Sequence, residues 1–326
     1  EVNNYLLRNE EGPFIVNTIK ECRDKIPQIK YVITLDADTE LVLDSAQKLI
    51  GTMEHPVNKP VIENGIVIKG YGLIQPKVGL SLDCEGASCF SKMFAGSGGI
   101  DIYSTAESNV YQDLFGEAIF TGKGIYNVEV FDKALSGEIP ENTVLSHDLL
   151  EGSYLRTGLA TDIELIDGFP SRVNSYMLRL HRWTRGDWQI VRWLNNKKIN
   201  GLSKYKIFDN LRRSLVDIFT LALFFCGFFW VPLLFIFFPV VFEYKIKKFY
   251  AFKNGWMKNA FVRCLTNLIL LPYRAILYLD AIITTIYRVT FSKKRLLEWT
   301  TAADAEKSLG KNVNSYIKEM IVDRKS

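Results

Sequence analysis

The sequence predicts an α/β domain that is followed by helices associated with a membrane. Short apolar runs and helix-like segments alternate over the first two hundred residues, which is typical of a domain built on a largely parallel sheet. A run of 25 residues without a charge follows, from 218 to 242, and exceeds the roughly 20 needed to cross a bilayer. We therefore expect a domain over 1–205, a membrane region over 206–290 and a cytosolic C-terminal segment over 291–326.

Composition and charge narrow the class of protein. The 326 residues are 48% hydrophobic, which is ample for a packed core and argues against intrinsic disorder. A net charge of only +4 lacks the concentrated positive field of a nucleic-acid binder, so we expect no nucleic-acid partner. Basic residues gather between 182 and 258, beside the apolar run, which favours the lipid bilayer as a partner.

The first elements of the domain follow from local signals. The β-rich apolar run 31–35 predicts a strand that ends at an acid. Asp44 or Ser45 can cap the next helix, whose apolar residues recur at helical spacing. Asn64-Gly65, the commonest dipeptide of tight hairpins, separates two short apolar runs. We therefore expect a strand, a helix and a hairpin in this order.

The later elements are signalled in the same way. The stretch 73–78 predicts a strand. Ser146 can cap a helix for which Gly158 is the expected stop, and 162–166 predicts the strand after it. A long helix-like segment follows from Ser171.

Two apolar stretches predict contact with a membrane. We expect 218–242 to be transmembrane. The second stretch, 265–287, is interrupted by Arg274 and Asp280, each of which costs about 2.5 to 3.5 kcal/mol at the middle of a bilayer. It therefore predicts either a second membrane helix or a helix in the interface. Basic residues occur on both sides of the first stretch, so the positive-inside rule does not orient it.

Asp36 and Asp38 are the first candidates for chemistry. Acids at i and i+2 beyond a strand lie in the crevice where open α/β sheets bind ligands. Their hard oxygens suit Mg²⁺ or Mn²⁺ bridging the phosphates of a nucleotide sugar, where the metal offsets the charge of the leaving diphosphate. A solvated acidic loop is the plain alternative. The other is a phosphatase of the haloacid dehalogenase type with Asp36 as nucleophile, although no acids follow the Gly186-Asp187 pair.

Asp148 is the candidate base, about 110 residues after these acids and at the start of a predicted helix. An inverting transfer requires one base that removes the proton of the acceptor hydroxyl. The alternative is that Asp148 only complements the helix dipole. His147, beside it, is more often structural than catalytic in such a place.

Arginines and tryptophans crowd the segment from Arg179 to Gln189. Arginine can clamp a diphosphate, and tryptophan offers a flat face to a sugar ring. An amphipathic helix at the membrane surface would have the same composition. Lys123, between Gly122 and Gly124, could meet a phosphate or a hydroxyl, although a glycine pair more often marks a turn.

A series of longer motifs adds a family resemblance. The chain contains, in order, LDADTE, GYGLIQPKV, YQDLFGEAIFTGKGIY, ENTVLSHDLLEG, RLHRWTRGDWQ and RLLEWTTAADAEK. This series closely resembles the glycosyltransferase region of bacterial cyclic β-1,2-glucan synthases, which belong to the GT-A superfamily together with cellulose synthase. The resemblance implies an incomplete GT-A-like mixed sheet with flanking helices. Because full proteins of this family are several times longer, we expect N-terminal and C-terminal parts of the parent protein to be missing.

The resemblance also implies roles for individual residues. Asp36 is expected on the nucleoside side of the donor, Asp38 at the donor and the metal, and Asp148 as the base. The donor is expected to be UDP-glucose, the acceptor a growing β-1,2-glucan, the cofactor Mg²⁺ or Mn²⁺, and the location the cytosolic face of the bacterial inner membrane, in a multi-pass protein. The remaining expected contacts are Arg179 and Arg182 at the diphosphate, and Trp183 and Lys123 at the acceptor.

Overall fold

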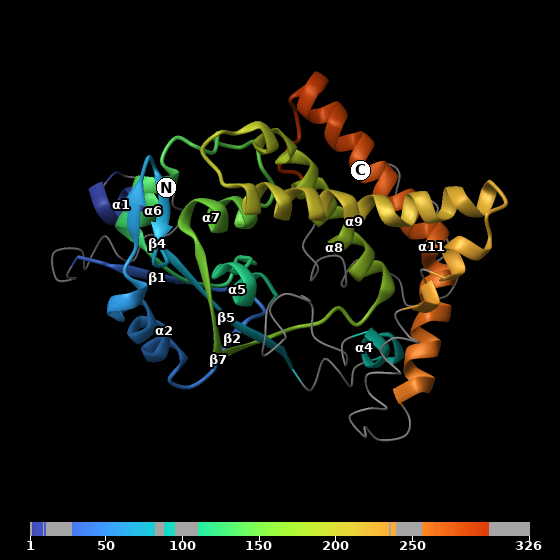
Figure 1. Cartoon of the computed structure of the whole chain (residues 1–326), viewed down its shortest axis with the longest axis horizontal. Helices are drawn as coiled ribbons and strands as arrows, with labels where there is room; N and C mark the ends of the chain where they lie inside the picture. Colours follow the sequence, from blue (N-terminus) through green and yellow to red (C-terminus); the bar gives the residue numbers. More distant parts are fainter. Residues whose placement is uncertain are drawn as a thin grey trace.

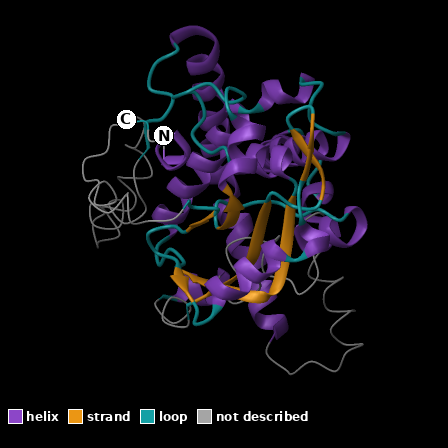
Figure 2. Ribbon diagram, turned by 90° about the vertical axis from the view of Figure 1, so that its left-hand side faces the viewer, coloured by secondary structure: helices purple, strands orange, loops and turns teal. Residues whose placement is uncertain are grey.

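A mixed five-stranded sheet forms the centre of the α/β domain in the computed structural model (Figures 1 and 2). The structure describes residues 2–8, 10, 28–81, 88–94, 110–234, 236–238 and 256–299. The strands of the sheet are β1 (Tyr31–Thr34), β2 (Glu40–Leu41), β5 (Leu73–Leu80), β6 (Gly124–Asn127) and β7 (Thr157–Asp167). Their spatial order is β1-β6-β5-β7-β2.

The direction of the strands differs from the simplest expectation. Within this sheet, only β5 and β7 pair in parallel, and the other neighbours are antiparallel. The expectation of a largely parallel sheet is therefore wrong, whereas a mixed sheet with flanking helices is confirmed. The reason is that β6 lies between β1 and β5 and runs against both of them.

Helices cover both faces of the sheet (Figure 1). They are α2 (Ser45–Glu54) on one face and α6 (Val128–Leu135) and α7 (Asp148–Leu155) on the other. Successive strand residues point to opposite faces. Leu73 accordingly packs into the core with α6 and α7, and Ile74, the next residue, packs against α2. Burying side chains of this size contributes about 1.5 to 3 kcal/mol each.

The register of β1 against β6 sets the position of two loops. Thr34 pairs with Gly124, so the chain that leaves β1 lies beside the chain that enters β6. A Cβ at Gly124 would lie 2.2 Å from the carbonyl oxygen of Ile74, which explains why glycine stands there. The loop after β1 therefore lies next to the loop 121–123.

The predicted hairpin is confirmed. Strands β3 (Val61–Glu63) and β4 (Ile66–Lys69) pair antiparallel as a separate two-stranded sheet. Asn64 and Gly65 both have positive φ, at 51° and 78°. Positive φ at both central residues is the requirement of a type I′ turn.

The observed helix ends differ from those that the local sequence signals predicted. Helix α2 forms, but Asp44 makes no side-chain cap hydrogen bond. Helix α7 begins at Asp148, and the Ser146 hydroxyl donates to the Asp148 carboxylate rather than to a backbone amide. Arg156, at φ 52°, ends the helix, and Gly158 lies inside β7. The physical reason is that the pairing of β7 with β5 already begins at the residue after Arg156.

The predicted helix after Ser171 is present as α8. It is followed by a short 3-10 turn and precedes two long helices. The remaining elements are α1 (Val2–Arg8), η2 (Pro56–Asn58), α4 (Cys89–Phe94), α5 (Val110–Phe115), α8 (Val173–Gln189), η3 (Val191–Asn195), α9 (Gly201–Phe225), α11 (Trp256–Tyr287) and η4 (Arg288–Ser292).

Helix α9 ends inside the apolar run 218–242. The amides of Gly227 and Phe228 donate back to carbonyls of the last turn, and Gly227 has φ 83°. This is a Schellman ending, which uses a glycine in the left-handed conformation. A single helix across 218–242 is therefore corrected to a helix that ends at 225, a turn, and further helical residues at 230–234 and 236–238. Residues 239–242 lie outside the described residues.

Helix α11 contains the second predicted stretch, 265–287. Together with the turn after it, the segment Phe261–Ser292 is 32 residues long and is apolar and long enough to cross a membrane. It lies at the side of the molecule opposite α1 (Figure 1). Among the described residues, this is the helix whose length and composition would allow it to cross a membrane.

The two charged residues of α11 within the stretch 265–287, Arg274 and Asp280, both have partners on neighbouring helices. The Nε atom of Arg274 lies 2.9 Å from Oδ2 of Asp217 in α9. Asp280 Oδ2 lies 3.2 Å from Nε2 of His181 in α8. These contacts tie α11 to α8 and α9, because each charge faces a helix that carries its partner.

Candidate active site

The loop after β1 carries the acids of the DxD motif. The amide of Thr39 donates to the Asp36 carbonyl oxygen at 3.1 Å, which closes a turn. Both acidic side chains are exposed. Asp38 lies against Gly168, where a Cβ would approach the Asp38 Oδ2 atom to 3.3 Å. The turn therefore presents both carboxylates beyond the end of β1.

Lys123 lies under this loop. Its Nζ atom is 2.9 Å from Asp36 Oδ2 and 2.8 Å from Asp167 Oδ2. Asp167 is the last residue of β7, and its other oxygen accepts a hydrogen bond of 2.9 Å from the Thr39 hydroxyl. Burial alone would lower the pKa of Lys123, but the two carboxylates outweigh it and raise the pKa. Lys123 therefore stays charged and joins the DxD loop to the end of β7.

Asp148 stands at the first turn of α7, close to the loop that carries Lys123. A Cβ at Gly122 would lie 3.3 Å from Asp148 Oδ2. Burial raises the pKa of Asp148 to about 6, and Glu151 adds to this effect. A carboxylate that titrates near neutral pH is matched to proton abstraction in that range.

The His147 and Glu151 side chains form a pair beside this carboxylate. His147 Nδ1 lies 2.7 Å from Glu151 Oε1, and the bond raises the pKa of His147 although burial opposes it. The functional atoms of His147, Asp148 and Glu151 all lie within 4.8 Å of one another. His147 lowers the pKa of Asp148, whereas Glu151 raises it. The pair thus sets part of the electrostatic environment of Asp148.

Helix α8 brings positive charge to the same place. The Arg182 guanidinium interacts electrostatically with the carboxylates of Asp36, Asp148 and Asp38. Burial lowers the pKa of Arg182, and Arg179 lowers it further. The carboxylates of the DxD loop and of α7 therefore act on one guanidinium of α8, although the DxD loop lies more than a hundred residues before α7 and α8 in the sequence.

The indole rings near α8 stack on its arginines. The Arg179 guanidinium lies 4.9 Å from the centre of the Trp183 ring, one helical turn away. The Arg182 guanidinium lies 4.5 Å from the centre of the Trp299 ring, in the segment after α11. Such contacts are worth about 0.5 to 1 kcal/mol at exposed sites. They orient both guanidinium groups.

The segment after α11 is tied to α8 by further bonds that the sequence did not reveal. Arg185 donates to the carbonyl oxygen of Glu298 at 2.7 Å, and Gln189 donates to that of Leu296 at 3.0 Å. On the opposite side of α8, Asp187 accepts a hydrogen bond of 3.0 Å from Asn210 of α9. Burial raises the pKa of Asp187 to about 7. Helix α8 is therefore fixed from two sides.

The Asp38 carboxylate has the chemistry that would suit a divalent ion. It makes no hydrogen bond or ion pair with another residue of the described part, and it offers the hard oxygen that Mg²⁺ and Mn²⁺ prefer. Asp36, by contrast, is already engaged by Lys123. Asp38 is the residue that would hold the ion.

The predicted site residues are thus only partly placed as expected. Asp36, Asp38, Asp148 and Arg182 come together, and Arg179 and Trp183 lie on the same helix. Lys123 was expected at the acceptor, but its side chain is 7% exposed and fully engaged by carboxylates, so this geometry gives that role no support.

Asp167 was missed. The available signal was an acid directly after the predicted strand 162–166, just as Asp36 directly follows the predicted strand 31–35.

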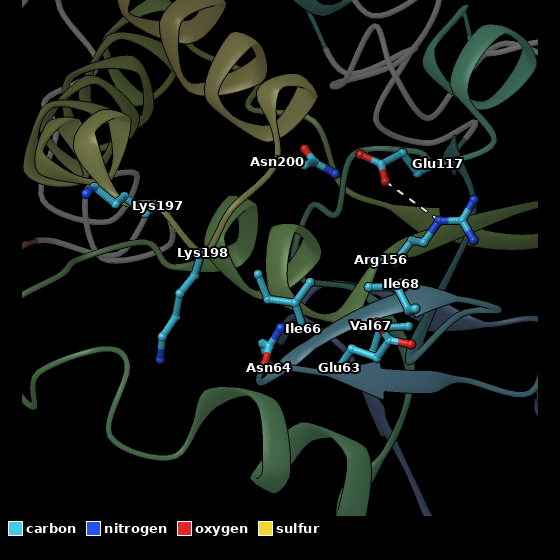
Figure 3. A pocket seen from close by; sticks show the side chains of 10 residues that line it. All are labelled: Glu63, Asn64, Ile66, Val67, Ile68, Glu117, Arg156, Lys197, Lys198 and Asn200. Atoms are coloured by element: carbon cyan, nitrogen blue, oxygen red, sulfur yellow. Dashed lines mark ion pairs between the residues drawn. The ribbon is translucent and has the colours of Figure 1, made fainter.

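A cavity of about 480 Å³ lies elsewhere, between the β3–β4 hairpin and the start of α9 (Figure 3). Figure 3 shows Arg156 and Glu117 facing each other at its edge, with 3.8 Å between Arg156 Nε and Glu117 Oε2. None of the predicted site residues lines this cavity. It is therefore separate from the candidate active site.

Comparison with known proteins bears on the resemblance described above. The chain is 37% identical, over an alignment 346 positions long, to the Cyclic beta-(1,2)-glucan synthase NdvB of Rhizobium meliloti (strain 1021). The alignment takes in 97% of this chain but only 12% of that relative's length. No family model matches the chain. The resemblance to a region of a cyclic glucan synthase, predicted from the ordered motifs, is confirmed.

Proposed function

We propose that this chain is the glycosyltransferase region of an enzyme that builds β-1,2-glucan from UDP-glucose at a membrane. The carrying observation is that the loop of Gly122 and Lys123 lies against Asp148 and is paired with Asp36, while the charges of Asp36, Asp38 and Asp148 all act on the Arg182 guanidinium. The identity to a cyclic glucan synthase over 97% of the chain supports the choice of product. In this reaction glucose is transferred with inversion, from the α-linked donor to a β-linked polymer.

Asp148 is the base in this proposal. Its carboxylate takes the proton of the acceptor hydroxyl while that oxygen attacks the anomeric carbon from the face opposite the diphosphate. The new bond joins the anomeric carbon to the acceptor oxygen, and the bond to the diphosphate breaks. A pKa of about 6 leaves Asp148 largely ionised at neutral pH yet basic enough to accept a proton.

The donor lies between the DxD loop and α8 in this proposal. Asp38 would hold the divalent ion, which would supply positive charge to the leaving diphosphate. Arg182 and Arg179 contact the diphosphate, because guanidinium groups bind phosphate oxygens in a bidentate manner. Asp36 contacts the nucleoside, and its position is held by Lys123. Groups that are already oriented in this way need little reorganisation during the reaction.

In this proposal the acceptor contacts Trp183 and the lipid contacts α11. Trp183 offers an aromatic face for a sugar ring. Helix α11 exposes the apolar side chains of Ile269, Ile276 and Ile283, which recur every seven residues and lie on one face. Asp280 and Arg274 face α8 and α9 instead. We assign this apolar face to the lipid, which places the site at the membrane surface.

The test is incorporation of radiolabelled glucose from UDP-glucose into polymer by the full-length protein. Asp148→Asn is expected to lower incorporation by at least a thousandfold, since it removes the base. Glu129→Gln, which changes an exposed acid on α6, serves as the matched control and is expected to retain full synthesis. Retained synthesis by Asp148→Asn would overturn the assignment of the base.

The phosphatase alternative has a test of its own. Its nucleophile would be Asp36, whose carboxylate is paired with Lys123. Phosphate release from a phosphosugar that is lost in Asp36→Asn would favour this alternative over the transferase.

A further inference from the structure

Lys123 is a buried lysine beneath the DxD loop, on the side of the site that is assigned to the donor. Its ammonium lies within 2.9 Å of two carboxylates, and its side chain is 7% exposed. The side chain of Asp167 is only 1% exposed, so this end of the pair has no access to water. The hydroxyl of Thr39 binds the remaining oxygen of Asp167. Three segments are thereby joined: the DxD loop, the loop before β6 and the end of β7.

The backbone on both sides of Lys123 is fixed. Gly122 has φ 89°, and a Cβ there would meet the Asp148 carboxylate at 3.3 Å. A Cβ at Gly124 would overlap the carbonyl oxygen of Ile74. The loop is therefore held between the proposed base and strand β5. This constraint directs the Lys123 side chain toward the carboxylates.

The two acids of the DxD motif consequently differ in charge environment. Asp36 has a resident cation at 2.9 Å. Asp38 has no ion pair with the described residues. A divalent ion chelated by both acids would have to displace or approach the Lys123 ammonium, and the two positive charges repel each other.

We propose that Lys123 is a positioning residue that holds Asp36 for the nucleoside and prevents Asp36 and Asp38 from chelating a divalent ion together. The ion then binds well only together with a nucleotide diphosphate, whose phosphate oxygens supply the ligands that Asp36 does not. This inference rests on the proposed function. It assigns Lys123 to the donor side, and it makes opposite predictions for metal alone and for metal with nucleotide.

The experiment measures binding by titration calorimetry on the full-length protein in detergent, with Mn²⁺ alone and with UDP in the presence of Mn²⁺. Lys123→Met removes the charge and keeps the length of the side chain. We expect it to bind Mn²⁺ alone more tightly, on the order of tenfold, because a repelling charge a few ångströms away is lost. We expect it to bind UDP more weakly, on the order of tenfold, because Asp36 is no longer held.

Two further variants complete the comparison. Lys123→Arg keeps the positive charge and is expected to stay close to the wild type in both measurements. Lys133→Met removes an exposed lysine that is paired with Glu129 within α6, and it is expected to change neither. If Lys123→Met fails to fold because Asp167 is left buried and unpaired, Lys123→Met/Asp167→Asn removes both charges and serves the same test.

Opposite shifts for the two ligands support the proposal. A merely structural role would weaken both or change neither, and either of these results overturns it. Wild-type protein that binds no UDP with Mn²⁺ would overturn the proposed function itself, and this inference with it.

Discussion

Asp148→Asn is expected to stabilise the fold at neutral and alkaline pH while it abolishes synthesis. Burial raises the pKa of Asp148 from an ordinary 3.8 to about 6. Each pH unit of such a change corresponds to about 1.4 kcal/mol, so the ionised side chain costs the folded state about 3 kcal/mol above pH 6. The amide carries no charge to desolvate and can still accept the hydrogen bond from Ser146.

The sign of the pH dependence follows from the raised pKa. Between pH 4 and pH 6 the folded wild type binds more protons at this site than the unfolded chain, so its stability falls as the pH rises through this window. Below pH 4 the carboxyl is neutral in both states, and the variant gains nothing. The difference in stability should therefore grow from pH 4 to pH 6 and then stay constant.

The assay is thermal unfolding of wild type and variant in one detergent, from pH 4 to pH 8. We expect the variant to melt several degrees higher at pH 8, given about 2 to 4 °C for each kcal/mol in chains of this size class. Glu129→Gln controls for the loss of an exposed acid, which is worth less than about 1 kcal/mol. A variant that is less stable than the wild type at pH 8, or a difference that does not depend on pH, would refute the reasoning.

Three other perturbations have defined outcomes. Gly122→Ala places a methyl group 3.3 Å from the Asp148 carboxylate at a positive φ, whereas Gly137→Ala, at a similar φ, meets nothing within 4 Å. Both variants should lose about 1 to 2 kcal/mol of stability from strain, but only Gly122→Ala should also lose synthesis. Equal activity in both would contradict the contact. Arg274→Met leaves Asp217 unpaired between α9 and α11 and should lower the free energy of unfolding by about 3 kcal/mol, whereas Arg274→Met/Asp217→Leu should recover most of this loss. A double variant as unstable as the single one would argue against the pair. Removal of divalent ions with EDTA should stop synthesis, and added Mg²⁺ or Mn²⁺ should restore it; synthesis that persists in EDTA would exclude the metal at Asp38.

Local sequence signals were sufficient for several elements of the fold. The strand near 31–35 and the Asn64-Gly65 hairpin formed as expected, because a β-rich run and a turn dipeptide act over a few residues. The direction of the strands could not be predicted in the same way. It depends on the placement of β6 between β1 and β5, which is a contact between distant parts of the chain. The glycine signal at Gly227 was present but was hidden within an apolar run.

The site was predictable where motifs supplied the residues, and not where tertiary contacts define them. Asp36, Asp38 and Asp148 stand out because acids follow an apolar strand or open a helix. Lys123 was noticed, but its partner Asp167 is 44 positions away, and the pairing depends on the ends of two different strands. The stacking of Trp299 on the α8 helix was missed for the same reason.

The most direct test of the proposed function is the structure of the polymer made by the full-length protein. The protein would be incubated with UDP-glucose and Mg²⁺ or Mn²⁺, and the product examined by NMR and by linkage analysis. We predict glucose residues joined through oxygen 2 in the β configuration, since an inverting transfer from an α-linked donor gives β. A polymer with α-linkages, or with links to another carbon, would contradict the proposal.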